Sequence, residues 1–374
     1  MPFSSEMDPG AVRAALESGA SADAQAAQAA VSGGVPSLEA AAALLSPAGS
    51  DMLEDLAQIA HRMTVARFGK TIAMYAPLYL SNQCACTCTY CGFSMGLNIR
   101  RKTLTRDEIS REAVTLAERG FRNILLVSAE HPKYVNVDYV CRSIEEVKKV
   151  SPYVGLEIAA ADEEQYRAYV ASGCDGVVLY QETYDPAIYA RHHLGGPKKK
   201  YHWRLDALER AGAAGVRHLG VGALLGLADW RFEALALLWH ARYLERRCWR
   251  SQINVSFPRI NPAAGGFVAD HPVDDRQLVQ LLCLFRLALP TAGIALSTRE
   301  TPQLRDRLVP LGITHMSAGS STEPGGYGAP GSAGKQFELE DTRTPAEVKA
   351  ALERMGYDAV FKDWEVMPAA SAST

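Results

Sequence analysis

The sequence predicts an α/β protein, a TIM-type (β/α)8 barrel preceded by a helical extension and followed by a lid and a tail. Three observations predict this fold. Eight short apolar segments follow one another, and segments with helical periodicity lie between them. Alternating strands and helices form a parallel sheet, and eight such units close it into a barrel. The length of 374 residues suits one barrel with additions, and 48% hydrophobic residues are enough for a large core.

The chain divides into four predicted parts. Residues 1–37 contain ten alanines together with Gly, Ser and Asp, and we predict a flexible extension of frayed helix or disorder with no assigned function. We expect a helical segment at residues 38–70, the barrel at residues 71–320, and a lid loop, a helix and a tail at residues 321–374. The glycine-rich stretch 317–335 is either a lid over the site or a surface loop.

Each predicted strand is rich in Val, Ile and Leu, which is typical of strands buried on both faces of a parallel sheet. The eight strands are residues 71–82, 123–130, 154–160, 176–182, 218–227, 253–260, 293–300 and 314–320. A helix is predicted at residues 105–120, because this segment begins with a Thr-x-x-Glu capping box and ends at Gly120. Another is predicted at residues 274–290, where Pro290 ends the helix.

Charge and hydropathy exclude several classes of protein. The net charge is −3 and the sequence pI is about 6.3, so neither nucleic acid nor an anionic membrane is an expected partner. No basic region followed by an apolar run opens the sequence, and no run approaches the roughly 18 apolar residues of a membrane-spanning helix. We therefore expect a cytoplasmic protein.

Four cysteines stand in the twelve residues "NQCACTCTYCGF" (82–93). In a reducing compartment such a cluster indicates a metal site, not a disulfide framework. Structural zinc usually requires a second pair of ligands, and the other four cysteines of the chain are isolated. Cys84, Cys88 and Cys91 have C-x3-C-x2-C spacing, and three thiolates can hold a [4Fe-4S] cluster while one iron stays open. Cys86 is then predicted not to be a ligand.

Polar residues follow six of the predicted strands. In a barrel of this type the active site lies at the carboxyl ends of the strands, so these residues mark the expected site. They are Ser81-Asn82, Glu130-His131, Gln181-Glu182, Pro258-Arg259, Arg299-Glu300 and Ser317 to Ser320.

The cysteine spacing resembles that of the radical S-adenosylmethionine (SAM) enzymes, in which the open iron binds the amino and carboxylate groups of SAM's methionine. Tyr90 matches the aromatic residue of that motif. Residues from about 38 to 366 are similar to the 2-iminoacetate synthases, the radical SAM tyrosine lyases of thiamine biosynthesis. The matching stretches include "RFGKTIAMYAPLYLSNQC", "CTYCGFSMGLNIRRKTL", "YQETYDPAIYARHHLGGPK", "SFPRI", "LSTRE", "PGGY" and "VFKDWE".

This resemblance implies a reaction. Reductive cleavage of SAM yields a radical that takes hydrogen from the amino group of L-tyrosine. The Cα–Cβ bond then breaks to give 2-iminoacetate (dehydroglycine) and p-cresol, with 5′-deoxyadenosine and methionine as the other products. The resemblance also implies thiazole synthase as a partner and a reductase such as flavodoxin or ferredoxin as the electron donor.

The resemblance further implies cofactor contacts. Glu130 takes the place of the segment that holds the methionine amino group, although "SAE" stands here where the family often has Gly-Gly-Glu. Glu182 is suited to bind the ribose hydroxyls or the amino group, and Arg204 the methionine carboxylate. Gly222 lets the backbone lie against the adenine, or serves only tight packing.

For the substrate, the resemblance assigns Arg299 to the carboxylate of tyrosine, with Ser317 as an added donor and Tyr79 in the ring pocket. The structural alternative is an ion pair between Arg299 and Glu300. Two further features are expected to lie in solvent, the lysines 198–200 and the histidine pair 192–193.

Other functions stay open. Tryptophan lyases and tyrosine-using deazaflavin synthases resemble this chain, and a non-catalytic iron–sulfur or zinc protein is the alternative from another class. The tyrosine lyase that builds hydrogenase iron carbonyls has an additional C-terminal C-x2-C pair. No cysteine follows Cys283 here, which argues against that function.

Overall fold

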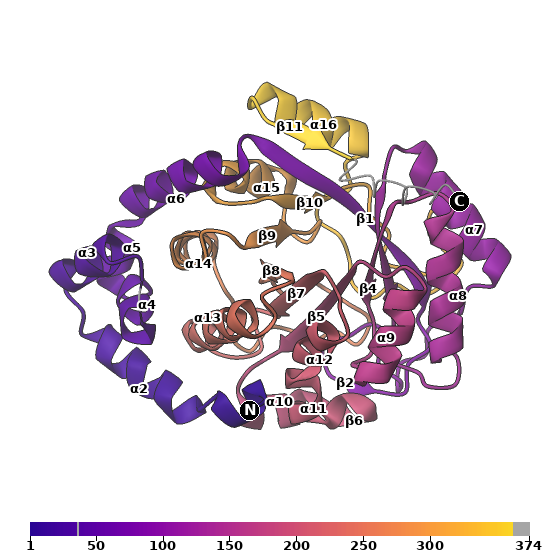
Figure 1. The fold of residues 1–374 in the computed structure, drawn as a ribbon, viewed down its shortest axis with the longest axis horizontal. Coiled ribbons are helices and arrows are strands. Elements are labelled where there is room, and N and C mark those ends of the chain that lie inside the picture. Colours follow the sequence, from indigo (N-terminus) through magenta and orange to yellow (C-terminus); the bar gives the residue numbers. More distant parts are fainter. Residues whose placement is uncertain (36, 362–374) are drawn as a thin grey trace, which may run out of the picture.

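A computed structural model describes residues 1–35 and 37–361 and confirms the predicted (β/α)8 barrel. Eight parallel strands follow one another in the order β1-β3-β4-β5-β7-β8-β9-β10, and pairing of β10 with β1 closes the barrel (Figure 1). All eight predicted strands are present. Their bounds are Thr71–Ser81 (β1), Asn123–Ser128 (β3), Tyr153–Glu157 (β4), Gly176–Glu182 (β5), His218–Ala223 (β7), Gln252–Ser256 (β8), Gly293–Leu296 (β9) and His315–Ser317 (β10).

The strand β1 joins the two edges of the sheet. Its first half pairs with β10 at residues 73–75, and its second half pairs with β3 at residues 76–81. Because every barrel pairing is parallel, the carboxyl ends of all eight strands meet at the same end. Apolar side chains such as Leu78, Leu126 and Leu156 are fully buried around this sheet. The barrel therefore fixes where the polar residues after the strands gather.

Helices connect the strands as predicted. The predicted capping box at Thr105 is present and opens α7, and a second capping box at Asp274 opens α14. The connecting helices are α7 (Arg106–Glu118), α8 (Val137–Lys148), α9 (Glu163–Ala171), α10 (Pro186–His192), α11 (Tyr201–Leu205), α12 (Ala207–Ala213), α13 (Trp230–Arg247), α14 (Asp275–Ala288) and α15 (Pro302–Leu308). After the barrel follow α16 (Pro345–Arg354) and β11 (Asp358–Val360), which pairs with β1. Residues 362–374 of the predicted tail lie outside the described residues.

A small antiparallel pair, absent from the predicted elements, joins two loops at the carboxyl end of the barrel. Strand β2 (Thr87–Cys88), within the cysteine loop, pairs with β6 (His193–Gly195), which follows β5 and α10. Strands of two and three residues are too short to show a periodic pattern. This pairing brings the segment after β5 against the cysteines.

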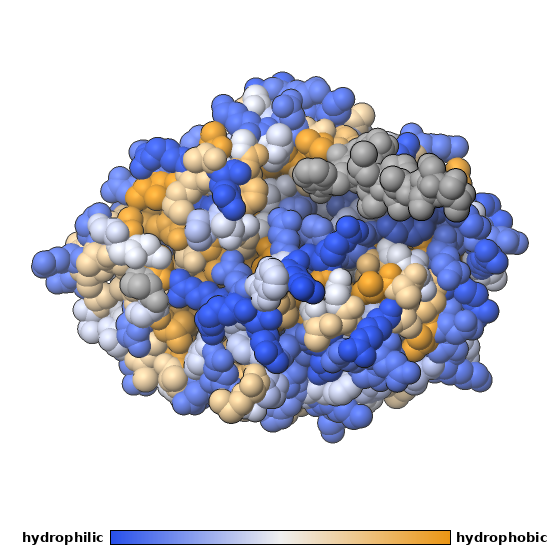
Figure 2. All heavy atoms as spheres, viewed as in Figure 1, coloured by the Kyte–Doolittle hydropathy of each residue, from blue (hydrophilic) through white to orange (hydrophobic). Residues whose placement is uncertain are grey.

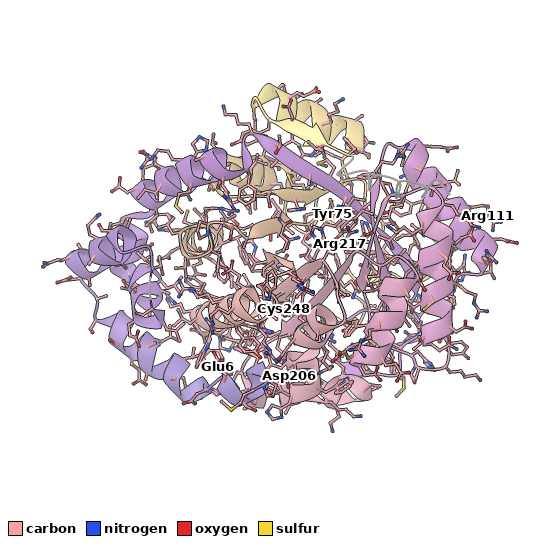
Figure 3. The ribbon with its side chains drawn as sticks, viewed as in Figure 1. Glu6, Tyr75, Arg111, Asp206, Arg217 and Cys248 are labelled. Atoms are coloured by element: carbon pink, nitrogen blue, oxygen red, sulfur yellow. The ribbon has the colours of Figure 1, made fainter. Side chains whose placement is uncertain are left out.

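The sequence predicts frayed helix or disorder for residues 1–37. The described residues among them form α1 (Phe3–Glu6), α2 (Pro9–Ala20) and α3 (Ala24–Ser32). The ring of Phe3 is fully buried and stacks on His240 with centroids 4.2 Å apart. Trp239 Nε1 donates to Glu6, labelled in Figure 3, over 3.0 Å. Phe3 and Glu6 contact residues of α13, which lies more than 200 residues further along the chain. The composition of residues 1–37 therefore does not reveal these contacts.

The predicted helical segment contains α4 (Leu38–Leu44), α5 (Pro47–Asp51) and α6 (Leu53–Phe68). Figure 1 shows the helices α2 to α6 in an arc along one side of the barrel, outside α13 and α14. Gln280 of α14 donates its amide to the backbone oxygen of Leu44 over 2.7 Å. These helices thus cover barrel helices on a side away from the cysteine loop, and they do not enter the site.

Hydrophilic residues cover most of the face drawn in Figure 2, and apolar residues form separate patches on it. Within residues 1–35 and 37–361, no helix has the length and hydropathy to cross a membrane.

Candidate active site

The four cysteines of residues 84–91 lie on the loop after β1, at the carboxyl end of the barrel. All four line one pocket, together with residues at the ends of β3, β4 and β5. The loop is held from behind by Arg101, whose guanidinium donates to the backbone oxygens of Asn82 and Phe93 at 2.7 Å each. The four cysteines therefore lie on a loop that Arg101 stabilises, and they line a shared cavity.

Two of the three predicted ligands already accept backbone hydrogen bonds. The N–H of Cys86 donates to Cys84 Sγ and that of Phe93 donates to Cys91 Sγ, each over 3.4 Å. Such bonds favour the thiolate and tune an iron–sulfur cluster. The Cys86 side chain lowers the pKa of Cys84 to about 6, whereas burial raises that of Cys88.

Cys86 has protein partners of its own. Its sulfur accepts from the backbone N–H of Lys198 over 3.4 Å and donates to Glu130 over 3.8 Å. The side chain is almost fully buried. These contacts agree with the prediction that Cys86 is a bracing residue and not a ligand, and that assignment stays a prediction.

Three of the predicted cofactor residues meet in the cysteine pocket. Arg204, on α11, donates to Glu130 over 2.9 Å and lies 3.4 Å from Glu182. Lys198 adds a second cation, 2.7 Å from the carboxylate of Glu182. All four side chains line the pocket that the cysteines line. Anions and cations therefore alternate around it, as recognition of the amino and carboxylate groups of a methionine requires.

The backbone of Glu182 has an unusual conformation of the kind found at functional sites. Its φ is +72°, and among the described residues only one other non-glycine residue, Val35, has a positive φ. Such a conformation is unfavourable for a residue with a Cβ and is concentrated at functional sites. The strained turn at the end of β5 points the carboxylate at Lys198.

His192 and His193 are buried and Lys198 is largely enclosed, which corrects the expectation that they lie in solvent, whereas Lys199 and Lys200 are exposed as expected. The ammonium of Lys198 sits 5.8 Å from the ring centroid of Tyr90. The hydroxyl of Tyr90 lies 2.8 Å from His193 Nε2, and Thr89 Oγ1 lies 2.7 Å from His192 Nδ1. Burial lowers the pKa of His193 to about 3, so this imidazole is neutral. The pairing of β2 with β6 creates this cluster, and no local pattern signals it.

A second pocket adjoins the first and contains Arg299. Cys91, Glu182 and Lys198 line both pockets. The guanidinium of Arg299 lies flat over the ring of Phe337, 3.4 Å from its centroid. Glu300 pairs with Arg259 instead, with Nε and Oε1 2.9 Å apart, so the alternative of an Arg299–Glu300 ion pair is wrong.

Among the described residues Arg299 has no ion-pair partner. The one hydrogen bond of its guanidinium is to the backbone oxygen of Arg259, over 3.4 Å. A guanidinium without an ion-pair partner in a partly enclosed pocket has the chemistry to bind a carboxylate through two parallel hydrogen bonds.

The glycine-rich loop after β10 reaches this pocket. Gln336, at its end, accepts a 2.7 Å hydrogen bond from the hydroxyl of Tyr79 and lines both pockets. Its backbone oxygen accepts from Gly92, next to Cys91, over 3.0 Å. On α7, Glu112 accepts from the backbone N–H groups of residues 327 and 328. The loop therefore packs against the cysteine loop, and Tyr79 lies at the contact between them.

Two predicted site residues lie elsewhere. Ser317 contacts Tyr75 inside the barrel, the residue opposite it in β1, which is labelled in Figure 3. It lines neither the cysteine pocket nor the Arg299 pocket. Gly222 also lines neither, and a Cβ there would come within 2.6 Å of the Tyr180 ring and 2.4 Å of the Ser256 backbone oxygen. Tight packing therefore explains why residue 222 is a glycine. The sequence had left packing open as the alternative to a contact with the adenine.

Glu157, the last residue of β4, is a site residue that the sequence did not single out. It lines both pockets. Burial, together with the charge of Glu182, raises the pKa of Glu157 to about 7, and the charge of Arg299 opposes this shift. The predicted strand extends to residue 160 and contains Glu157 in its interior, so strand-end polarity does not mark it; a lone acidic residue within an apolar run was the available signal.

The donor set fits a [4Fe-4S] cluster with SAM. Among the residues that the structure describes, no three His, Cys, Asp or Glu side chains converge on a position for a single metal ion. The four thiols of residues 84–91 instead border a cavity, and three of them are enough to hold a larger cluster. The carboxylates and cations in the same cavity are complementary to a zwitterionic methionine group. Cys84, Cys88 and Cys91 are the residues that would hold the cluster.

Comparison with known proteins agrees with this geometry. Residues 78–238 match the radical SAM superfamily, and residues 256–358 match the biotin and thiamin synthesis associated domain. The chain is 46% identical to 2-iminoacetate synthase of Escherichia coli (strain K12) over 324 residues, which is 86% of each chain. It is 44% identical to 2-iminoacetate synthase of Salmonella typhimurium over the same share of each chain.

Among solved structures, the chain superposes on HydG, a maturase of the [FeFe]-hydrogenase, with a TM-score of 0.90 and 33% identity. The match covers 94% of this chain and 80% of that one. The cysteine pocket, the strand-end residues and these relatives lead to one conclusion. The chain belongs to the 2-iminoacetate synthase family of radical SAM enzymes.

Proposed function

We propose that this chain is the lyase that cleaves the Cα–Cβ bond of L-tyrosine into 2-iminoacetate and p-cresol, for the thiazole moiety of thiamine. The observation that carries the proposal is the Arg299 pocket, since it adjoins the cysteine pocket and contains an arginine with no ion-pair partner among the described residues. A fragmentation started by SAM requires the amino acid to be held this close to the cofactor.

The cluster and SAM supply, on one-electron reduction, a radical able to take a hydrogen atom from the substrate. The residues of the chain hold the reactants. Glu130, Glu182 and Arg204 are proposed to bind the polar groups of SAM, with Lys198 keeping Glu182 ionised. Arg299 is proposed to bind the tyrosine carboxylate through two parallel hydrogen bonds, which fix angle as well as distance.

The lid is proposed to exclude water. Gln336 lies in both pockets, and the loop that carries it is tied to α7 through Glu112. Exclusion of water protects a radical from side reactions and strengthens the charge contacts inside the site. Tyr79 is proposed to line the ring pocket beneath this loop, where its hydroxyl is held by Gln336.

A radical SAM enzyme needs a reductant, and we propose flavodoxin or ferredoxin as the donor. We further propose that thiazole synthase receives 2-iminoacetate directly, because an imine hydrolyses readily in water. Both partners fit a protein of the cytoplasm, where we place this chain.

The test is anaerobic turnover of the reconstituted protein with L-tyrosine and L-tryptophan in parallel. We expect p-cresol and 5′-deoxyadenosine with L-tyrosine only. Cleavage of SAM without p-cresol would refute the substrate assignment, and an indole product from L-tryptophan would favour the tryptophan lyase alternative. Absence of SAM cleavage, with bound zinc in place of iron, would favour a non-catalytic protein.

A further inference from the structure

An α-amino acid carries a carboxylate and an ammonium group on the same carbon. A site built for one therefore presents a cation and an anion to the same cavity, neither of them already neutralised by the protein. Arg299 is such a cation. It remains to identify the carboxylate of the site that is free to bind the ammonium group. This inference rests on the proposed cleavage of L-tyrosine.

Most carboxylates near the two pockets are already paired. Glu130 has Arg204 at 2.9 Å, and Glu182 has Lys198 at 2.7 Å. Glu300, on the far side of Arg299, pairs with an arginine of its own. Glu130 and Glu182 are also the carboxylates proposed to bind the polar groups of SAM, and Glu300 is occupied by Arg259, so none of the three is left for the ammonium group of the substrate.

Glu157 is the exception. Within residues 1–35 and 37–361 its side chain makes no hydrogen bond and no ion pair, although Glu157 lines both the cysteine pocket and the Arg299 pocket. Arg299 lies close enough to favour its charged form but forms no ion pair with it. The two unpaired charges thus face one cavity with a gap between them.

We propose that Glu157 is the positioning residue for the α-amino group of the substrate, accepting a hydrogen bond from it while Arg299 binds the α-carboxylate. Because Glu157 borders both pockets, a nitrogen bound there faces the cofactor side. The pair therefore orients the nitrogen, and not the aromatic ring, toward the atom that takes the hydrogen. It also restricts the site to ligands that carry both charges.

Three probes separate the two contacts. L-tyrosine carries both groups, tyramine carries only the amine, and 3-(4-hydroxyphenyl)propionate carries only the carboxylate. Binding is measured by equilibrium dialysis against the cluster-loaded protein with SAM and no reductant, so that no turnover occurs. Glu157→Gln should weaken L-tyrosine and tyramine about 10- to 100-fold, the effect of losing one charge-assisted hydrogen bond, and leave the propionate unchanged.

Arg299→Lys should show the opposite pattern, weakening L-tyrosine and the propionate while leaving tyramine unchanged. Glu338→Gln, at an exposed glutamate paired with Lys335, is the matched control and should alter none of the three affinities. Glu157→Asp keeps the charge but shortens the side chain, so it should weaken L-tyrosine and tyramine and leave the propionate unchanged; this second variant serves as the test if Glu157→Gln loads its cluster poorly.

The inference is overturned if Glu157→Gln binds tyramine as the unaltered protein does, or if its affinity for SAM falls together with that for tyrosine, because Glu157 then serves the cofactor. Failure of the proposed function would give a different result in the same binding measurements. The unaltered protein would then prefer another aromatic amino acid over L-tyrosine, and Glu157→Gln would still weaken that ligand.

Discussion

Replacing Arg299 by lysine separates charge from geometry. The guanidinium is held flat by the ring of Phe337 at 3.4 Å and has no carboxylate partner among the described residues. Lysine keeps the charge but offers a single point contact in place of two parallel hydrogen bonds. Loss of one charge-assisted hydrogen bond costs about 1.5–3 kcal/mol, or roughly 10- to 100-fold in rate, and a misplacement of about 1 Å costs a similar factor.

We therefore expect Arg299→Lys to lower the rate of p-cresol formation about 10- to 100-fold, with 5′-deoxyadenosine still released as an abortive product. Both products are quantified in one anaerobic assay, and iron content and SAM affinity confirm an intact cofactor site. Arg259→Lys is the matched control, because that arginine already has Glu300 as its partner and should leave product formation within a factor of about three. A p-cresol yield near that of the unaltered protein would refute the carboxylate clamp.

Three further changes test other parts of the site and the fold. Cys88→Ala should abolish the four-iron cluster on anaerobic iron and sulfide analysis while Cys86→Ala keeps it, and the reverse result would disprove the ligand assignment. Lys198→Met should raise the dissociation constant for SAM at least about tenfold, because Lys198 is the cation that lies nearer to the buried carboxylate of Glu182. An unchanged dissociation constant would mean that Lys198 has only a structural role. Burial raises the pKa of Glu233 to about 8, so its contribution to stability is full below pH of about 4.5 and is lost as pH rises to about 8. In denaturant unfolding, Glu233→Gln should remove up to about 1.4 kcal/mol per pH unit of this decline, and identical pH profiles would contradict the buried acid.

The sequence was sufficient for the barrel because the signals are local. Runs of apolar residues mark buried strands, and capping residues such as Thr105 and Asp274 mark where helices begin. Strand-end polarity also predicted the site, since parallel strands bring all their carboxyl ends together. On this basis Glu130, Glu182 and Arg299 were correctly expected at one end of the barrel.

Residues 1–35 show the limit of composition. An alanine-rich stretch with few large side chains predicts flexibility when it is considered alone. Phe3 and Glu6 nevertheless find partners on α13, and a few such contacts are enough to order short helices against an existing surface.

By itself the sequence determined the fold and the chemistry at the cysteines, because strand patterns, helix caps and ligand spacing are set by neighbours along the chain. Only the tertiary structure decided which charges are paired. It placed Lys198 against Glu182 through the β2–β6 pairing, paired Glu300 with Arg259 and Ser317 with Tyr75, and left Arg299 and Glu157 without ion-pair partners among the described residues. Pairing depends on distances between residues far apart in the chain, and these distances exist only after the barrel has closed.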